Sequence, residues 1–238
     1  MKFTARRSAL IGLVVATFVG LASFSTGCTA STATKCGAGR VCGDAPAPIP
    51  SRDALALLDT LRVADRAAKT GYSREQFGPA WTDNVAVPGG DNGCDTRNDM
   101  LVRDLTDVTF KAGDCTVSTG TLNDLYTGKV IHFKRGPKSS DDVQIDHIVA
   151  LSDAWQKGAQ QLSPERRRDL ANDPLNLQAV DGPTNQSKSD SDAASWLPPS
   201  SGYRCAYLTR QIQVKAAYRL WVTPAEKDVM VRELRTCP

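Results

Sequence analysis

Five polar residues have the side-chain types that hydrolysis of a phosphodiester needs, namely Asp146, His147, Asn176, Asn185 and Lys188. An imidazole ionises near neutral pH, so it can take a proton from an attacking water molecule. Carboxylate and amide oxygens are the ligands that Mg²⁺ prefers, and a divalent cation neutralises charge on a phosphate and on the leaving oxygen. The residue types therefore predict metal-assisted hydrolysis, with Asp146 and Asn185 as metal ligands and a lysine that meets the substrate phosphate.

The elements expected around these residues would bring them together. Alternating side chains over 143–149 predict a strand that carries Asp146 and His147 at its end, where both can reach one site from different directions. Residues 175–180 predict a second strand, on which the Asn176 amide would bond the backbone or a His147 nitrogen. After a break at 181–183, a short helix opens at residue 184 or 185 and runs to about 190. Asn185 and Lys188 are three residues apart and would share a face of this helix.

These segments resemble a known nuclease motif. The stretches 146–149, 176–180 and 185–190, with Asn185 nine positions after Asn176, are similar to the HNH motif, also called the ββα-metal or His-Me finger motif. Their local sequence is similar to that of the HNH module of RNA-guided CRISPR nucleases. The resemblance implies that Asp146 is a metal ligand, His147 the general base and Asn176 an orienting residue. The last motif position is Asn185 where a histidine is common, which favours a hard metal ion over zinc.

A wider resemblance covers residues 90–238. Phrases at 103–105, 126–128, 171–177 and 196–199 are similar to those of exported actinobacterial HNH proteins related to the C-terminal nuclease domain of GmrSD restriction enzymes. It implies an α+β fold with a ββα-metal core at 143–190, added helices and short strands, and disulfides. It also implies an endonuclease that uses Mg²⁺, with Mn²⁺ as an alternative, on nucleic acid, DNA rather than RNA, with little sequence specificity.

The N-terminus predicts export. Basic residues at 2, 6 and 7 precede an uncharged apolar run over 9–24, as in a signal peptide, which we place at 1–28. Either a general secretion signal or a twin-arginine signal fits this stretch. Cys28 follows small residues as at a lipoprotein cleavage site, although Ser25 stands where leucine is usual. Residues 29–50, rich in Ala, Thr, Gly and Pro, predict a flexible tether before a nuclease domain over 51–238. The protein would be secreted, or anchored as a lipoprotein at the outer face of the cell membrane through lipidated Cys28.

Composition is compatible with a soluble nuclease. The 238 residues are 41% hydrophobic and 23% charged, with a formal net charge of +3, which permits contact with phosphates without demanding it. If Cys28 is lipidated or removed, six cysteines remain, and sequence proximity favours the pairs 36–42, 94–115 and 205–237. No two cysteines have CxxC spacing, so the zinc sites built from such pairs are not supported.

Several other features favour structural roles. We expect His132 to be an ordinary strand residue, Arg166–Arg168 a solvated helix face, and Trp155 and Trp196 packing residues. Helical spacing predicts a helix over 53–69, and a strand is expected over 101–109. Residues 203–220 have a mixed pattern, and a closing helix is expected from about 223 to 234.

Two alternatives to a nuclease remain open. One is a non-catalytic envelope-associated binding protein on an HNH scaffold, and the other is a hydrolase of a different envelope phosphodiester. The complete set of Asp, His and two Asn residues favours catalysis over binding.

Overall fold

A computed structural model describes residues 49–113 and 115–238. The expected signal peptide, nearly all of the tether, Cys28 and the pair Cys36–Cys42 lie outside these residues. The helices and short 3₁₀ turns of the described part are α1 (Ser51–Thr60), η2 (Arg74–Phe77), α2 (Thr96–Asp104), α3 (Leu151–Gln156), η3 (Ala159–Gln161), α4 (Pro164–Asn172), α5 (Gly182–Lys188), α6 (Ser201–Ala217) and α7 (Pro224–Leu234). The strands are β1 (Leu105–Phe110), β2 (Val117–Asn123), β3 (Val130–Lys134), β4 (Val143–His147) and β5 (Leu177–Asp181).

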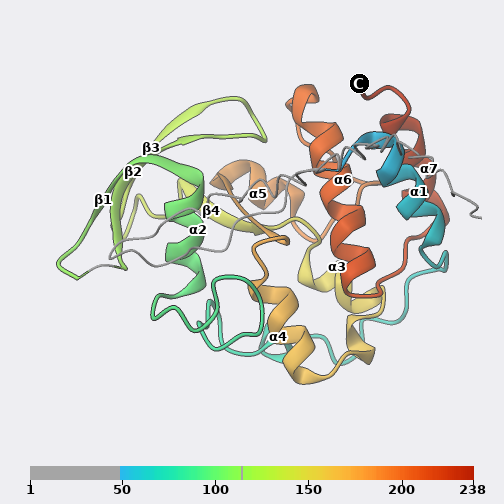
Figure 1. The fold of residues 1–238 in the computed structure, drawn as a ribbon, viewed down its shortest axis with the longest axis horizontal. Helices are drawn as coiled ribbons and strands as arrows, with labels where there is room; N and C mark the ends of the chain where they lie inside the picture. Colours follow the sequence, from blue (N-terminus) through green and yellow to red (C-terminus); the bar gives the residue numbers. More distant parts are fainter. Residues whose placement is uncertain (1–48, 114) are drawn as a thin grey trace, which may run out of the picture. The chain divides into compact units, whose positions relative to one another are not determined.

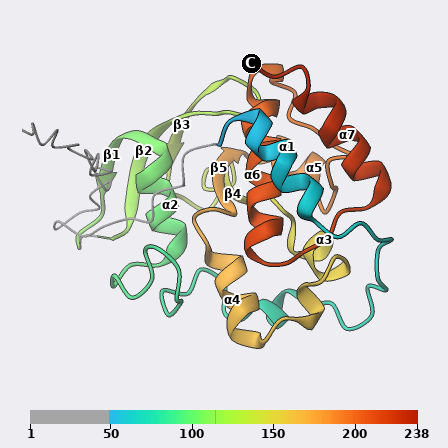
Figure 2. The same ribbon diagram turned by 45° about the vertical axis from the view of Figure 1, so that its right-hand side comes forward.

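The strands form two small antiparallel sheets, so the expected α+β class is confirmed. One sheet has the order β1-β2-β3, and the other is the pair β4-β5. The three-stranded sheet and α2 lie at one end of the described part, and α1, α6 and α7 pack together at the other (Figures 1 and 2). The pair β4-β5 lies between these groups.

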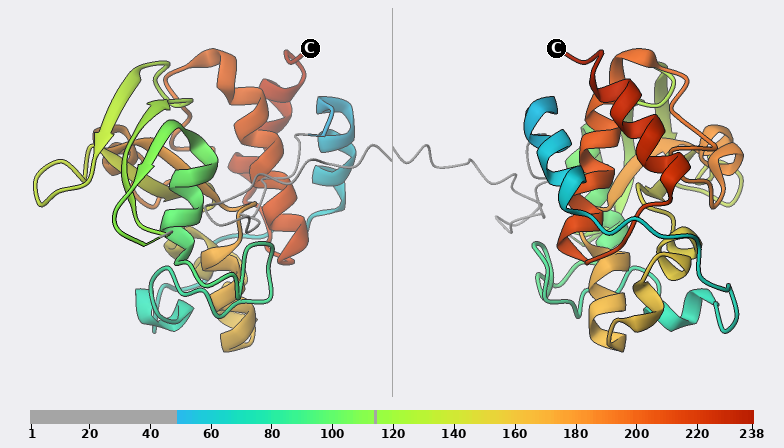
Figure 3. Two further views of the ribbon diagram at one scale, coloured as in Figure 1. Left: turned by 60° about the vertical axis from the view of Figure 1, so that its left-hand side comes forward. Right: turned by 90° about the vertical axis from the view of Figure 1, so that its right-hand side faces the viewer.

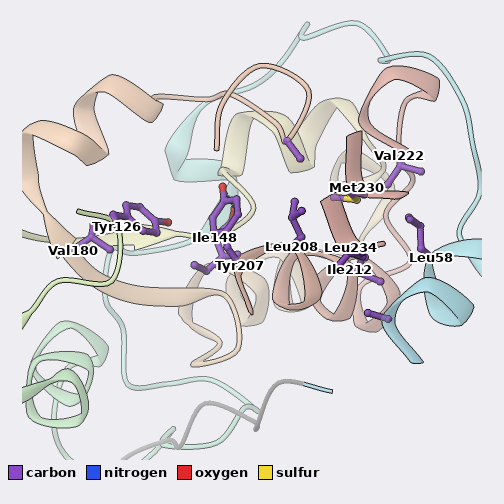
Figure 4. Close-up of a cluster of buried hydrophobic side chains, with 12 residues drawn as sticks. Leu58, Tyr126, Ile148, Val180, Tyr207, Leu208, Ile212, Val222, Met230 and Leu234 are labelled. Atoms are coloured by element: carbon purple, nitrogen blue, oxygen red, sulfur yellow. Dashed lines mark hydrogen bonds between the residues drawn. The ribbon is translucent and has the colours of Figure 1, made fainter. Parts of the chain in front are cut away.

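Three apolar clusters surround the β4-β5 pair. The first joins α1, α6 and α7 to Tyr126, Ile148 and Val180 (Figure 4). The second is built from α3, α4 and the end of α6, and the third from α2, the three-stranded sheet and the inner residues of β4 and β5. All five residues of β5 are buried. A strand pair buried on both faces has little freedom to move, so it is a rigid base for side chains at its ends.

A buried network of charged side chains connects the helices α3, α6 and α7. The side chains of Lys157, Asp153, Asp192 and Glu226 are at most 3% exposed, and Lys157 Nζ lies 2.7–2.8 Å from oxygens of all three carboxylates. Lys215 and the partly exposed Arg66 complete the network. Because buried charges need partners, this network joins α3, α6 and α7 to the loop that follows α5. The ribbons of α6 and α7 lie side by side (Figure 3).

Three expected elements differ from the structure. The first helix ends at Thr60 instead of continuing to residue 69, because the chain turns extended there and Val63 pairs with Val222. The strand expected over 101–109 begins only at Leu105, as β1, because residues 96–104 form helix α2, whose N-terminus is capped by the Asp95 side chain, which accepts from Asn98 N. Most of the stretch 203–220 with a mixed pattern belongs to a single helix, α6, which ends at Ala217 and is packed on both sides.

Other expectations are confirmed. Disulfides join Cys94 to Cys115 and Cys205 to Cys237. The closing helix expected from about residue 223 to 234 is α7, and Thr223 forms a capping box with Glu226 at its start. Within the described residues, no helix has both the length and the apolar character that a membrane span requires.

Candidate active site

The candidate site is built on β4, β5 and the helix that follows them directly. β4 and β5 pair from Val143 opposite Asp181 to His147 opposite Leu177. The Asp181 carboxylate accepts from Thr184 N at 2.9 Å and so caps α5. At Gly182 a β-carbon would collide with the carbonyl of Asp141. The chain can therefore pass straight from β5 into α5 because glycine stands at this position.

Asp146 is held by two buried donors. The Tyr126 hydroxyl donates to Oδ2 at 2.5 Å, and the Lys188 ammonium donates to Oδ1 at 2.9 Å. Burial, together with the neighbouring carboxylate, raises the pKa of Tyr126 well above its ordinary value, so its phenol stays protonated and donates. An ionised carboxylate offers about four acceptor positions, so Asp146 can still bind a further ligand.

The position of Lys188 differs from the expectation that it meets a substrate phosphate. Its side chain is 0% exposed, and Nζ donates to Asp146 and to the His147 carbonyl at 2.8 Å. The ammonium thus links the end of α5 to the end of β4. In this structure it is a neighbour of the candidate metal ligand and does not face solvent.

Asn185 lies on the same side of β4 as Asp146. Its Nδ2 donates to Oε1 of Gln144 at 2.9 Å, which leaves Oδ1 as the acceptor. Gln144 and Asp146 are two residues apart on a strand, so both point toward α5. The alternation of β4 thereby places the Asp146 carboxylate on the face of the strand that Asn185 contacts through Gln144.

His147 points the other way, as the alternation of a strand requires. Its ring stacks on Trp81, with ring centres 5.8 Å apart and planes 11° from parallel. Nε2 lies 2.9 Å from the carbonyl oxygen of Ala171. A carbonyl only accepts, so Nε2 carries the proton and Nδ1 keeps its lone pair in the neutral ring.

The surroundings of His147 favour the neutral ring. Burial lowers the pKa of His147 to about 3, and the positive charges of Arg74 and Lys188 act in the same direction. The hydrogen bond with Ala171 opposes this shift without cancelling it. At neutral pH the imidazole is therefore unprotonated at Nδ1 and has the form that a general base requires.

Asn176 takes the backbone alternative of its two expected roles. Its side chain is fully buried, accepts from Val149 N at 2.9 Å and donates to the carbonyls of Val149 and Leu170 at 3.3 and 3.1 Å. These bonds fix the chain just after His147 to the end of α4, which also carries Ala171. Asn176 thus orders the backbone on both sides of the imidazole without bonding the ring itself.

A polar hollow of about 420 Å³ brings three of the expected residues together. Asp146, His147 and Asn185 all line it. Arg74 also lines it and is exposed, and no described carboxylate lies within salt-bridge distance of its guanidinium. At the rim, Lys69 pairs with Asp190 at 3.0 Å. The hollow therefore combines oxygen donors, a neutral imidazole and the positively charged guanidinium of Arg74.

The donor set fits a hard cation with few protein ligands. In the part of the chain that the structure describes, no three His, Cys, Asp or Glu side chains are grouped so that they could hold an ion. Mg²⁺ needs no such group, because it keeps several waters and is often held by one or two protein oxygens. Structural zinc sites take four nitrogen or sulfur ligands. Asp146 and Asn185 are thus suited to Mg²⁺ or Mn²⁺.

Three neighbours of the site were not expected from the sequence. Trp81 and Arg74 come from the segment before α2, which carries no motif, so nothing in the sequence connects them with His147. Tyr126 lies in the segment 126–128, whose sequence is similar to that of the family, and this similarity was the only sequence feature that pointed to Tyr126. His132 is exposed on β3, and Trp155 is a buried core residue, both as expected.

Comparisons with known proteins identify the family of the chain. The profile of a protein family described as the C-terminal domain of GmrSD restriction endonucleases matches residues 95–233, more than half of the chain. The chain belongs to this family. The match to the GmrSD C-terminal domain includes β4, β5 and α5, and begins after the segment that carries Arg74 and Trp81.

A fungal protein is similar in sequence to most of this chain. It is named "Uncharacterized secreted protein", from Arthroderma benhamiae, and is 37% identical over 201 residues, which cover 81% of this chain and 92% of the relative. No solved structure matches. Membership in the GmrSD C-terminal family indicates a nuclease-type function in general.

Proposed function

We propose that this protein is a metal-dependent endonuclease that hydrolyses phosphodiester bonds in nucleic acid, DNA in preference to RNA, with little sequence specificity. The observation that carries the proposal is the polar hollow, because the neutral imidazole of His147, the Asp146 carboxylate and the Asn185 amide all line it. They stand on a strand pair followed by a short helix, the arrangement expected of an HNH, or ββα-metal, core. Family membership supports the same class of reaction.

In the proposed mechanism Asp146 and Asn185 would hold a divalent cation, Mg²⁺ or Mn²⁺. The cation would supply charge neutralisation on the leaving 3′ oxygen. His147 Nδ1 accepts a proton from water while the water oxygen attacks phosphorus and the bond to the 3′ oxygen breaks. The leaving 3′ oxygen takes a proton from a second water molecule, so the products are a 5′ phosphate and a 3′ hydroxyl.

The remaining residues position these groups. Tyr126 and Lys188 hold the Asp146 carboxylate from two sides, and Asn176 fixes the backbone that follows His147. Arg74 is exposed at the hollow, so its guanidinium can bind the substrate phosphate in the role that Lys188 was expected to play.

Cleavage of DNA by the purified protein tests the proposal. Supercoiled plasmid and single-stranded circular DNA are incubated with Mg²⁺, with Mn²⁺ or with EDTA, and the products are separated by electrophoresis. We expect nicked or linear products with either cation and none with EDTA. Cleavage that persists in EDTA would refute metal dependence. Binding of DNA without cleavage under any cation would favour a binding protein, and hydrolysis of only a small phosphodiester would favour another substrate.

We also propose that the protein is exported. The sequence predicts a signal peptide, and the fungal relative bears the name of a secreted protein. Anchoring through Cys28 is a separate proposal, tested by fractionating cells that express the wild type or Cys28→Ser. An anchored protein would move from the membrane fraction to the medium in the variant, whereas wild-type protein found in the medium would refute the anchor.

A further inference from the structure

A second hollow, of about 500 Å³, opens beside the polar one. Its walls are the segment 74–81, which includes η2, together with Leu151, Ala171 and Asn172. Phe77 and Trp81 give this hollow an aromatic lining, and its lining is more apolar than that of the polar hollow. His147 borders it as well.

The two hollows adjoin each other, because they share three lining residues. Arg74, His147 and Leu151 belong to both. A phosphate placed near Arg74 and His147 in the polar hollow would therefore leave the adjoining part of its ligand at the entrance of the apolar one. The apolar hollow is thus suited to hold a group that is covalently attached to the reacting phosphate.

The wall formed by 74–81 is fixed by helix α4. Arg167 donates from Nε to the Gln76 carbonyl at 2.8 Å, and the side chain of Arg168 packs so closely over Gly78 that a β-carbon there would lie 3.2 Å from it. Phe77 is 1% exposed within the second apolar cluster. The arginines expected to form a solvated face thus support this wall, and the hollow is formed before any ligand binds.

Trp81 is held in an unusual backbone conformation. Its φ is +57°, a region in which residues other than glycine are uncommon. Such conformations are retained where the surrounding structure requires them, and they are concentrated at functional sites. Here the conformation accompanies an indole that stacks on the imidazole and lines the apolar hollow.

We propose that the apolar hollow receives a nucleobase next to the scissile phosphate, so that the protein acts on unpaired DNA. The inference rests on the proposed nuclease function and names its substrate class. Aromatic side chains bind bases of any sequence by stacking, which agrees with little sequence specificity. A base inside a duplex is stacked and paired, and it enters a side pocket only when it leaves the helix. Single strands and locally unpaired sites present such a base without that cost.

Removal of one base tests the inference. A short DNA strand contains one phosphodiester among phosphorothioate linkages, with an intact or an abasic nucleotide on either side of it. Cleavage is measured with Mg²⁺ for each strand and for the matching duplex. Binding of the same DNAs is measured in EDTA by fluorescence anisotropy. We expect one of the two abasic strands to be cut and bound about 10-fold more weakly, the usual order of effect for one stacked base. The duplex should also be a poorer substrate than the intact strand.

A substitution that fills the hollow gives the second arm. Ala80 is exposed and lines the apolar hollow, so Ala80→Phe should reduce cleavage of the intact strand and have little further effect on the sensitive abasic strand. Ala112→Phe, the same change at an exposed turn residue outside both hollows, is the matched control.

The outcomes separate this inference from the nuclease proposal. Equal cleavage and binding of intact and abasic strands would overturn the base pocket while leaving the nuclease function in place. A duplex cut faster than its single strand would also overturn it. If no strand is cut under any cation, the nuclease proposal fails, and the anisotropy arm still decides whether the hollow binds a base.

Discussion

The Lys188 ammonium lies 2.9 Å from Oδ1 of Asp146, and both side chains are buried. The same ammonium donates to the His147 carbonyl, so a single charge joins the end of α5 to the two site residues at the end of β4. The carboxylate receives its second donor from Tyr126, whose ring belongs to the first apolar cluster (Figure 4). The geometry of the candidate metal ligand therefore depends on the packing of the core.

Removal of the ammonium should be costly. Lys188→Met leaves the buried Asp146 charge without its partner, and we expect a loss of about 3–5 kcal/mol in the free energy of unfolding. The combination with Asp146→Asn should recover much of this loss, because no uncompensated charge then remains. Urea denaturation of the single and double variants measures the coupling. Lys227→Met is the control, since its partner Asp59 is exposed and such pairs contribute at most about 1 kcal/mol. Equal losses in the two lysine variants would contradict the prediction.

Replacement of the general base should affect cleavage more than stability. Glutamine can still donate to the Ala171 carbonyl, so His147→Gln should keep the fold while it lowers the rate of DNA cleavage by about 100-fold or more. His132→Gln, at the other histidine of the chain, should cleave like the wild type because His132 is exposed on β3. Rates are compared at saturating Mg²⁺ together with thermal unfolding of each variant. A His147→Gln protein that cleaves at the wild-type rate would remove His147 from the mechanism.

The fold could be predicted from the sequence where local signals agree with tertiary packing. Alternation over 143–149 predicted β4, because a strand period acts over a few neighbours. The break expected at 181–183 is instead the point where β5 passes directly into α5, which begins at Gly182 and not at 184 or 185. Residues 61–69 have helical spacing but turn extended, since Val63 pairs with Val222 and Arg66 joins the buried charge network. Contacts between residues so far apart in the sequence leave no local pattern.

The candidate site was predicted in the same partial way. Asp146, His147 and Asn185 were expected together from their spacing on a strand pair and a helix, and they line one hollow. The burial of Lys188 was not expected, because helical spacing gives the direction of a side chain around its helix and not what covers it. Arg74 and Trp81 reach the site from a segment without periodicity, which only tertiary structure brings there.

Asp99 should make stability depend on pH. Burial raises its pKa to about 7, whereas an unfolded Asp titrates near 4. Between these values the folded state binds a proton that the unfolded state does not, so stability falls as pH rises through this window. Asp99→Asn removes this titration, and its melting temperature should fall less than that of the wild type between about pH 4 and pH 8. Melting curves that run parallel for the two proteins would contradict the assignment.

The disulfide between Cys205 and Cys237 should stabilise the fold without being needed for the site. It links the start of α6 to the chain end across 32 residues, and the entropy of closing such a loop in the unfolded chain corresponds to about 3–4 kcal/mol. The double variant Cys205→Ser/Cys237→Ser should therefore unfold at lower urea concentration. Its DNA cleavage well below the unfolding transition should equal that of the wild type, because β4, β5 and α5 lie outside this link. Loss of cleavage in a variant that remains folded by circular dichroism would show that α6 and the C-terminus also position the site.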